Sequence, residues 1–265
     1  MLSNAIFKRM PDKDLGSGQC SIADITVASQ DRILINNASN ESVQLYNTRT
    51  DELMTEIQLD AVAENICMYG SVMAAVGKRK VKQVQLIKIK DDTLTLDRVL
   101  DINNDALGIT SCGNCLVVSY ISEPWLEMIS PEEGGAVKCL VDNTEAAQHF
   151  KFPNYLTSSK SGFIYVSDSG TDTIIKLDLS LNVLQTFSNT PLHTPYGIAL
   201  VSEDQMIVCS TGSMRFLLLR LDTGRMSSIL GNQSIIPYHI SFCQERKRIY
   251  LASGVTSSIN VFAIE

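Results

Sequence analysis

The sequence is poor in the residues that most often carry catalysis. Only three of its 265 residues are histidines, namely His149, His193 and His239, and only one is tryptophan. None of the histidines lies in an HExxH segment, beside a GxSxG turn or next to a pair of cysteines. Neither a zinc-hydrolase motif nor a nucleophilic triad is therefore indicated. The sequence predicts no catalytic residue, no metal site and no cofactor.

Long apolar runs are also missing. Apolar residues make up 45% of the chain, yet no run approaches the roughly 18 residues that a membrane helix needs. The first residues, MLSNAIFKRMPDKD, contain no basic segment followed by an apolar stretch and a cleavage site, which indicates no secretory signal. The seven cysteines are an odd number, which disfavours a disulfide framework. We expect a cytoplasmic protein without membrane contact.

What the sequence does contain is alternation at two length scales. On the short scale, runs rich in Ile, Val, Tyr and Phe alternate with turn formers such as Ser161-Gly162 and Asp168-Ser169-Gly170. This pattern is typical of consecutive antiparallel strands joined by tight turns. One such group of strands cannot bury both of its faces alone, so other parts of the chain must cover it.

On the longer scale the chain repeats itself about every 42 residues. We predict that each repeat holds two apolar anchors ten residues apart, in its second and third strands. The six pairs are Ile33 and Val43, Ala74 and Val84, Leu116 and Leu126, Ile164 and Ile174, Ile207 and Leu217, and Ile249 and Ile259. The first anchors advance by 41, 42, 48, 43 and 42 residues, and the irregular step coincides with the polar insertion at 141–150. A period of this length with four short strands is typical of a β-propeller blade.

We therefore predict an all-β, six-bladed β-propeller formed by the whole chain, 1–265, as a single domain. The predicted blades are 18–60, 61–101, 102–141, 152–190, 194–232, and 236–265 together with 4–9. The last repeat has only three strands, and the segment NAIFKR at 4–9 precedes the first complete repeat without a partner. Pairing this N-terminal strand with the last blade would close the ring and remove an open sheet edge.

Several repeats resemble a known family. The segment PNYLTSSKSGFIYVSDSGTDTIIKLDLSLNVL (153–184) resembles the NHL repeat, as does 194–226 and, more loosely, 107–130. The first repeat, 22–47, is similar to the opening blade of the propellers that end many tripartite-motif ubiquitin ligases. The resemblance implies an NHL-like propeller that recognises a ligase substrate through one face. Any ligase activity would reside in segments that this sequence does not contain.

Three tyrosines follow prolines just before the predicted first strands of neighbouring repeats. The segments are Pro153-Asn154-Tyr155, Pro195-Tyr196 and Pro237-Tyr238-His239. Equivalent positions in adjacent blades would place these rings in an arc around the channel mouth, where tyrosine suits partner recognition. The alternative is that they pack blade against blade.

Basic residues are expected to contribute to partner binding on the same face. Lys78, Arg79 and Lys80 fall in the predicted loop between the second and third strands of the second repeat, and in the resembled family such loops share a face with the segments before the first strands. We predict that the tyrosines and His239 anchor a protein partner and that the basic residues steer it. The predicted binding set is Tyr155, Tyr196, Tyr238, His239, Lys78, Arg79, Lys80 and Arg215. The default interpretation of the basic run itself is a solvated charged surface, and the alternative is a contact with a phosphate or an acidic partner.

Two other functions stay open. The same face could bind RNA, with bases stacked on the aromatic residues and phosphates on the basic loop, although a net charge of −7 weakens attraction to nucleic acid. A lactonase-like, metal-dependent hydrolase would instead need oxygen ligands in the channel. The candidates for such ligands are Asp24, Glu64, Asn65 and Asn154. Cys112-Gly-Asn-Cys115 could bind zinc or form a disulfide, but its Gly-Asn falls where a strand-to-strand turn is predicted.

Overall fold

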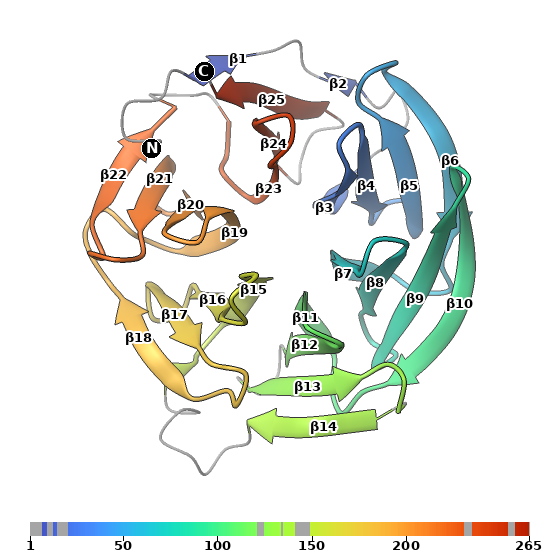
Figure 1. Cartoon of the computed structure of the whole chain (residues 1–265), viewed down its shortest axis with the longest axis horizontal. Helices are drawn as coiled ribbons and strands as arrows, with labels where there is room; N and C mark the ends of the chain where they lie inside the picture. Colours follow the sequence, from blue (N-terminus) through green and yellow to red (C-terminus); the bar gives the residue numbers. More distant parts are fainter. Residues whose placement is uncertain are drawn as a thin grey trace.

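Six antiparallel sheets stand in a ring around a central channel (Figure 1). The computed structural model describes residues 7–9, 13–14, 21–120, 125–133, 135–140, 149–230, 235–253 and 258–264. The elements of this part of the chain are all strands. None of the described residues forms a helix with the length and hydrophobicity of a transmembrane span. The all-β, six-bladed β-propeller predicted from the repeats is confirmed.

Each blade begins at the channel and runs outward. In the first three blades the strands are β3 (Ile22–Ser29), β4 (Arg32–Asn37), β5 (Ser42–Asn47) and β6 (Glu52–Gln58); β7 (Ala63–Tyr69), β8 (Met73–Lys78), β9 (Gln83–Lys90) and β10 (Thr93–Asp101); and β11 (Ala106–Cys112), β12 (Cys115–Tyr120), β13 (Leu126–Ser130) and β14 (Gly135–Leu140).

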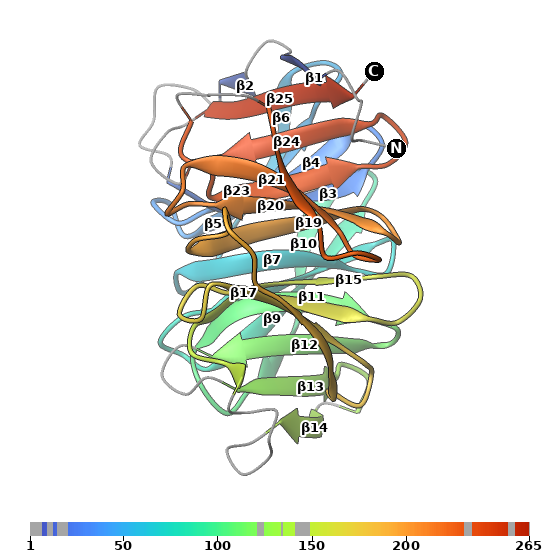
Figure 2. The same cartoon turned by 90° about the vertical axis from the view of Figure 1, so that its left-hand side faces the viewer.

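The other three blades follow the same order. Their strands are β15 (Pro153–Ser158), β16 (Ile164–Asp168), β17 (Thr173–Leu177) and β18 (Val183–Phe187); β19 (Pro195–Ser202), β20 (Gln205–Ser210), β21 (Arg215–Arg220) and β22 (Met226–Ile229); and β23 (His239–Cys243), β24 (Arg248–Ala252) and β25 (Ser258–Ile264). Figure 2 shows from the side how these sheets stack around the ring.

The last blade is completed by the beginning of the chain. Strands β1 (Phe7–Arg9) and β2 (Lys13–Asp14) both pair antiparallel with β25, with Phe7 opposite Ile264 and Lys13 opposite Ile259. The predicted closure by an N-terminal strand is confirmed. The pairing also reaches further along the chain than the predicted 4–9, because it includes residues 13–14. Backbone N–H and C=O groups on the outer edge of β25 thereby gain partners.

Apolar residues of neighbouring blades pack against each other and form the core. Between the first and second blades, for example, Leu34 and Leu45 lie in one cluster with Ala74 and Val76. The middle strands are buried on both faces, which is why they read as nearly continuous apolar runs rather than as an alternation. All twelve predicted anchors are at most 1% exposed.

One backbone hydrogen bond recurs and defines a face of the ring. In four blades the residue after the second strand donates its N–H to the carbonyl oxygen of the residue before the first strand. The pairs are Ala38 with Ser21, Arg79 with Val62, Ser169 with Phe152 and Thr211 with Thr194, at 2.8–3.1 Å. The loops 38–41, 79–82, 169–172 and 211–214 therefore lie on the same side as the segments that lead into the first strands. We call this side the mouth face.

Candidate ligand-binding site at the mouth of the channel

The first strands are irregular where they leave the mouth face. In five blades the ladder between first and second strands shifts register within the first few residues, for example between Ala63 and Ile66 and between Pro195 and Ile198. Such a bulge leaves a residue out of the ladder and re-aims its side chain. The residues at these shifts that line a common cavity are Ala23, Glu64, Asn65, Leu107, Asn154 and Tyr196.

That cavity, the mouth pocket, has a volume of about 340 Å³ and receives at least one residue from every blade. Besides the bulge residues it is lined by Arg79, Phe152, Tyr155, Tyr238 and His239. It shares Asn65 and Tyr155 with a second cavity of about 240 Å³ that all six first strands line along the channel. The pocket is therefore the outer end of the central channel.

The four predicted aromatic residues meet in this pocket. The ring centroids of Tyr155 and Tyr196 are 6.2 Å apart, those of Tyr196 and Tyr238 4.2 Å, and His239 lies 4.9 Å from Tyr238 and 5.5 Å from Tyr155. Tyr155 and His239 are only 8% and 4% exposed, whereas Tyr196 and Tyr238 are half-buried. The first two thus form the floor between blades, and the other two form an accessible wall.

A polar network holds the floor. The Tyr155 hydroxyl contacts Nδ1 of His239, which lies 3.7 Å from Oδ1 of Asp24. The two carboxylate oxygens of Asp24 also accept backbone N–H bonds from Ile25 at 2.8 Å and Ile66 at 3.0 Å. Burial, aided by the negative charge of Asp24, raises the pKa of Tyr155 well above its ordinary value. Tyr155 therefore stays a neutral phenol at physiological pH.

The wall carries a second carboxylate. Glu64 Oε1 lies 2.6 Å from Nη1 of Arg79, whose side chain is about half exposed. The pKa of Tyr238 is raised, first by burial, then by its hydrogen bond with Tyr196, and also by the charge of Glu64.

The prediction that Lys78 lies in the loop between the second and third strands is wrong. Lys78 is the last residue of β8, its side chain is fully buried, and its Nζ lies 2.7 Å from Oδ1 of Asp60, just before the first strand. The hydrogen bond from Lys78 lowers the pKa of Asp60. Asp168 and Ser210, which end the second strands of their blades, likewise bond the segment before the first strand. A buried ammonium needs a partner, so Lys78 ties its blade together.

The other predicted cations are exposed on the mouth face. Arg79 and Lys80 lie in the loop 79–82, and Arg215 begins β21 directly after the loop 211–214. Of these three only Arg79 lines the mouth pocket. Their roles in partner binding stay predictions.

Two of the four side chains considered as metal ligands, Asp24 and Glu64, already have protein partners. Asp24 accepts the backbone bonds described above, and Glu64 pairs with Arg79. Within the described ranges no group of three or more His, Cys, Asp or Glu side chains is placed to hold a metal ion. Cys112 and Cys115 face each other across the turn between β11 and β12, both as free thiols, and burial raises the pKa of both.

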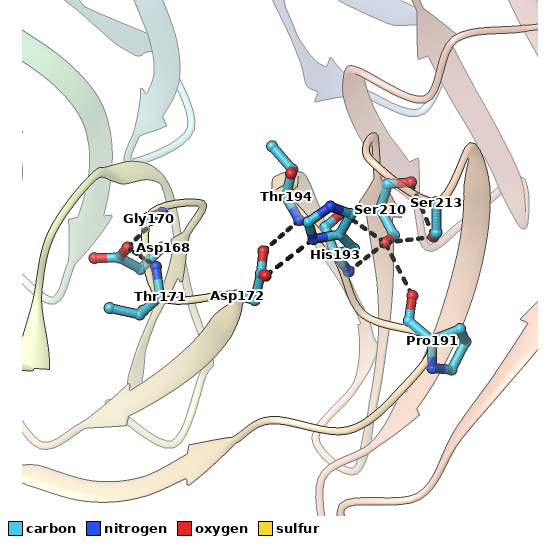
Figure 3. A network of polar contacts seen from close by, with 9 residues as sticks. All are labelled: Asp168, Gly170, Thr171, Asp172, Pro191, His193, Thr194, Ser210 and Ser213. Carbon is cyan, nitrogen blue, oxygen red and sulfur yellow. Dashed lines mark hydrogen bonds and ion pairs between the residues drawn. The ribbon is translucent and has the colours of Figure 1, made fainter.

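Sequence reasoning missed two features of this face. One is Phe152, which precedes Pro153, is 50% exposed and lines the pocket. An apolar residue in the turn before a first strand could have predicted this position. The other is a polar network that joins the fourth and fifth blades (Figure 3). In it Asp172 lies 2.9 Å from Nδ1 of His193 and accepts the Thr194 N–H at 2.6 Å.

Asp168 fixes the conformation of the loop 169–172, which also carries Asp172. Its Oδ1 accepts the N–H groups of Gly170 at 2.9 Å and Thr171 at 3.0 Å (Figure 3). Its carboxylate also accepts the N–H groups of Lys151 and Phe152. This one side chain therefore fixes both the loop 169–172 and the entry segment that carries Phe152, which explains why an Asp-Ser-Gly sequence stands here.

The Asp172 link should make stability depend on pH. Burial raises the pKa of Asp172, but the bonds from the Thr194 N–H and from His193 lower it more, so the net pKa lies below the ordinary 3.8. A depressed carboxyl pKa contributes stability that is present above the unfolded pKa and is lost as pH falls through the folded pKa. Asp172→Asn should therefore flatten the loss of stability below about pH 4, as measured by urea unfolding between pH 2.5 and 7.

Because Asp172 is partly exposed, the effect at neutral pH should stay below about 1 kcal/mol. Glu52→Gln, which neutralises an exposed carboxylate on the outer strand β6, is the matched control and should leave the pH profile unchanged. If the free energy of unfolding falls equally steeply with decreasing pH in the wild type and in Asp172→Asn, the link from Asp172 to His193 and Thr194 does not contribute to the pH dependence.

Solved structures of other proteins share the fold of this chain at low sequence identity. No protein-family model and no curated sequence matches it. A streptogramin B lyase structure matches with a TM-score of 0.72 at 10% identity, covering 98% of each chain. Virginiamycin B lyase from Staphylococcus aureus gives 0.69 at 15%, over 97% of this chain and 99% of that chain. The Cps50 (Swd1) β-propeller domain of Myceliophteria thermophila gives 0.67 at 12%, over 92% and 84%. Such low identities show the propeller fold alone.

Proposed function

We propose that this propeller is a non-catalytic recognition module that binds a protein partner through its mouth face. The observation that carries the proposal is the mouth pocket itself. Two half-buried tyrosines, Tyr196 and Tyr238, and the exposed Phe152 surround a cavity to which all six blades contribute. Large rings with few rotatable bonds are the side chains most enriched at the energetic centres of protein interfaces.

Two further properties of the mouth face support a protein partner. Exposed large apolar residues stand on it at Val81, Phe152, Met214 and Ile236. The tyrosine rings also pack on one another and on the buried floor, so they lose little freedom when a partner binds. Tyr196 and Tyr238 would be the anchors, while Lys80 and Arg215 would meet acidic groups around them.

The proposal extends to the biological setting. The resemblance of the repeats to NHL propellers supports a role in substrate recognition for a tripartite-motif ubiquitin ligase. Five cysteines in the described part of the chain are free thiols, which suits the reducing cytoplasm.

Photocrosslinking tests this function. We would place p-benzoylphenylalanine at Phe152 in the purified protein, irradiate it in extract of the native cells, and compare it with the same probe at Leu184, an equally exposed site on the outer strand β18. We expect adducts from position 152 that resist RNase, are digested by protease and are lost in Tyr196→Ala and Tyr238→Ala. Adducts that RNase removes would mean that the partner is RNA and not a protein. Equal amounts of adduct from both positions would show that the mouth face has no specific binding site.

A further inference from the structure

We infer that the mouth pocket accepts an arginine side chain of the partner. This inference rests on the proposed function and names the chemistry of the bound group. Three kinds of observation lead to it: the sign of the charge in the pocket, the arrangement of its rings, and an arginine of this chain that already occupies part of it.

The charge of the pocket favours a cation. Glu64 lines the wall, and Asp24 lies beneath the floor, 3.7 Å from the His239 ring nitrogen. Both carboxylates lie close enough to a pocket tyrosine to add to the effect of burial on its pKa, Asp24 for Tyr155 and Glu64 for Tyr238. The single lysine or arginine among the residues that line the pocket, Arg79, is neutralised by Glu64 and reaches solvent. With Glu64 paired to Arg79, Asp24 remains as an excess negative charge at the pocket, and a phosphate or carboxylate would enter against it.

The rings provide faces for that cation. Tyr196 and Tyr238 lie 4.2 Å apart with a tilt of 34°, and Tyr155 meets Tyr196 edge to face at 61°. Phe152 adds an exposed ring at the same cavity. The face of an aromatic ring carries partial negative charge and attracts lysine, arginine or ammonium groups, with arginine the most frequent partner.

The polar lining distinguishes guanidinium from a methylated ammonium. Glu64, Asn65 and Asn154, whose side chains carry oxygen acceptors, line the same cavity as the rings. A guanidinium presents five N–H donors in a plane, so it can stack on a tyrosine while it donates to these acceptors. A trimethylammonium has no donor and would leave the acceptors without a partner. An ammonium donates but cannot stack as a plane.

Arg79 shows how a guanidinium meets this wall. Its Nη1 lies 2.6 Å from Oε1 of Glu64, at the edge of the pocket, while about half of its side chain is exposed. It comes from the loop 79–82 and not from the rigid floor. Exposed ion pairs are weak, so an arginine that gains ring contacts as well can displace it from Glu64. Arg79 thus competes with the bound arginine instead of steering the partner, the role predicted from the sequence.

The test is a titration of ¹⁵N-labelled protein, followed by NMR, with pentapeptides Gly-Ser-X-Ser-Gly in which X is arginine, lysine, trimethyllysine or phosphoserine. We expect the arginine peptide to bind about tenfold more tightly than the others and to shift amide signals around the pocket. Tyr238→Leu should lose about tenfold in affinity, whereas Tyr238→Phe, which keeps the ring, should retain it. Arg79→Gln should bind the arginine peptide several-fold more tightly, because Glu64 is freed.

Each opposite result would overturn the inference. Weaker binding of the arginine peptide to Arg79→Gln would mean that Arg79 does not compete with the bound arginine, and preference for the phosphoserine peptide would mean an anion site. Equal affinity for the arginine peptide and for the lysine or trimethyllysine peptide would mean that the site is not selective for a guanidinium group. The arginine peptide should also compete with the adduct formed at Phe152. Persistence of a protein adduct at saturating peptide would leave the proposed function standing and remove only the arginine assignment, whereas failure to form any protein adduct would remove the proposed function.

Discussion

Deleting residues 1–14 should lower the thermal midpoint of the protein by about 10 °C. The deletion removes β1 and β2, which pair with β25 from Phe7 opposite Ile264 to Asp14 opposite Ser258. The backbone groups on the outer edge of β25 would lose their partners, and several net hydrogen-bond contributions of about 1 kcal/mol each translate into a shift of that size in a chain of this length. The exposed edge should also promote self-association.

The control is a shorter deletion of residues 1–5, which leaves both strands in place. Differential scanning calorimetry measures the midpoints, and light scattering measures association. If the two truncated proteins melt together with the full chain, the pairing on β25 does not contribute to closing the ring.

Gly197→Ala should both destabilise the fold and abolish ligand binding. Gly197 lies at the register shift of β19, where its N–H donates to the carbonyl oxygen of Tyr238 at 2.9 Å. A Cβ at this position would stand 2.6 Å from that oxygen and 3.0 Å from the backbone nitrogen of Ile240. Since both contacts are backbone atoms, the fifth and sixth blades must separate, at a cost of about 2 kcal/mol. Tyr238 would move away from Tyr196.

Gly70→Ala is the matched control for this substitution. Gly70 lies on the opposite face of the ring with φ of +67°, and no heavy atom beyond Gly70 and its two chain neighbours lies within 4 Å of the position that an alanine Cβ would take. Alanine there causes backbone strain but no clash. It should cost about 1 kcal/mol and leave the pocket intact. Urea unfolding gives the stabilities, and titration with the arginine pentapeptide gives the affinities. Full affinity in a folded Gly197→Ala protein would show that the contact between these blades does not position the pocket.

The arrangement of side chains in the mouth pocket can be predicted only in part from the sequence. The spacing of Pro153-Asn154-Tyr155, Pro195-Tyr196 and Pro237-Tyr238 predicts that the rings approach one another, because equivalent positions of neighbouring blades lie side by side. The closing contact, from Tyr155 to His239, joins residues 84 positions apart in the sequence. Whether a ring forms floor or wall depends on how far its blade covers it.

The sequence by itself determined the number of blades, the buried anchors and the partner of the N-terminal strand. Strand alternation and a 42-residue period are local signals, and an incomplete last repeat leaves one edge that a spare strand can fill. Only the tertiary structure decided that Lys78 is buried against Asp60, that Arg79 neutralises Glu64, and that the floor is held by Asp24. These outcomes depend on register shifts at the start of the first strands, which re-aim side chains by one position and have no signature in the pattern of apolar residues.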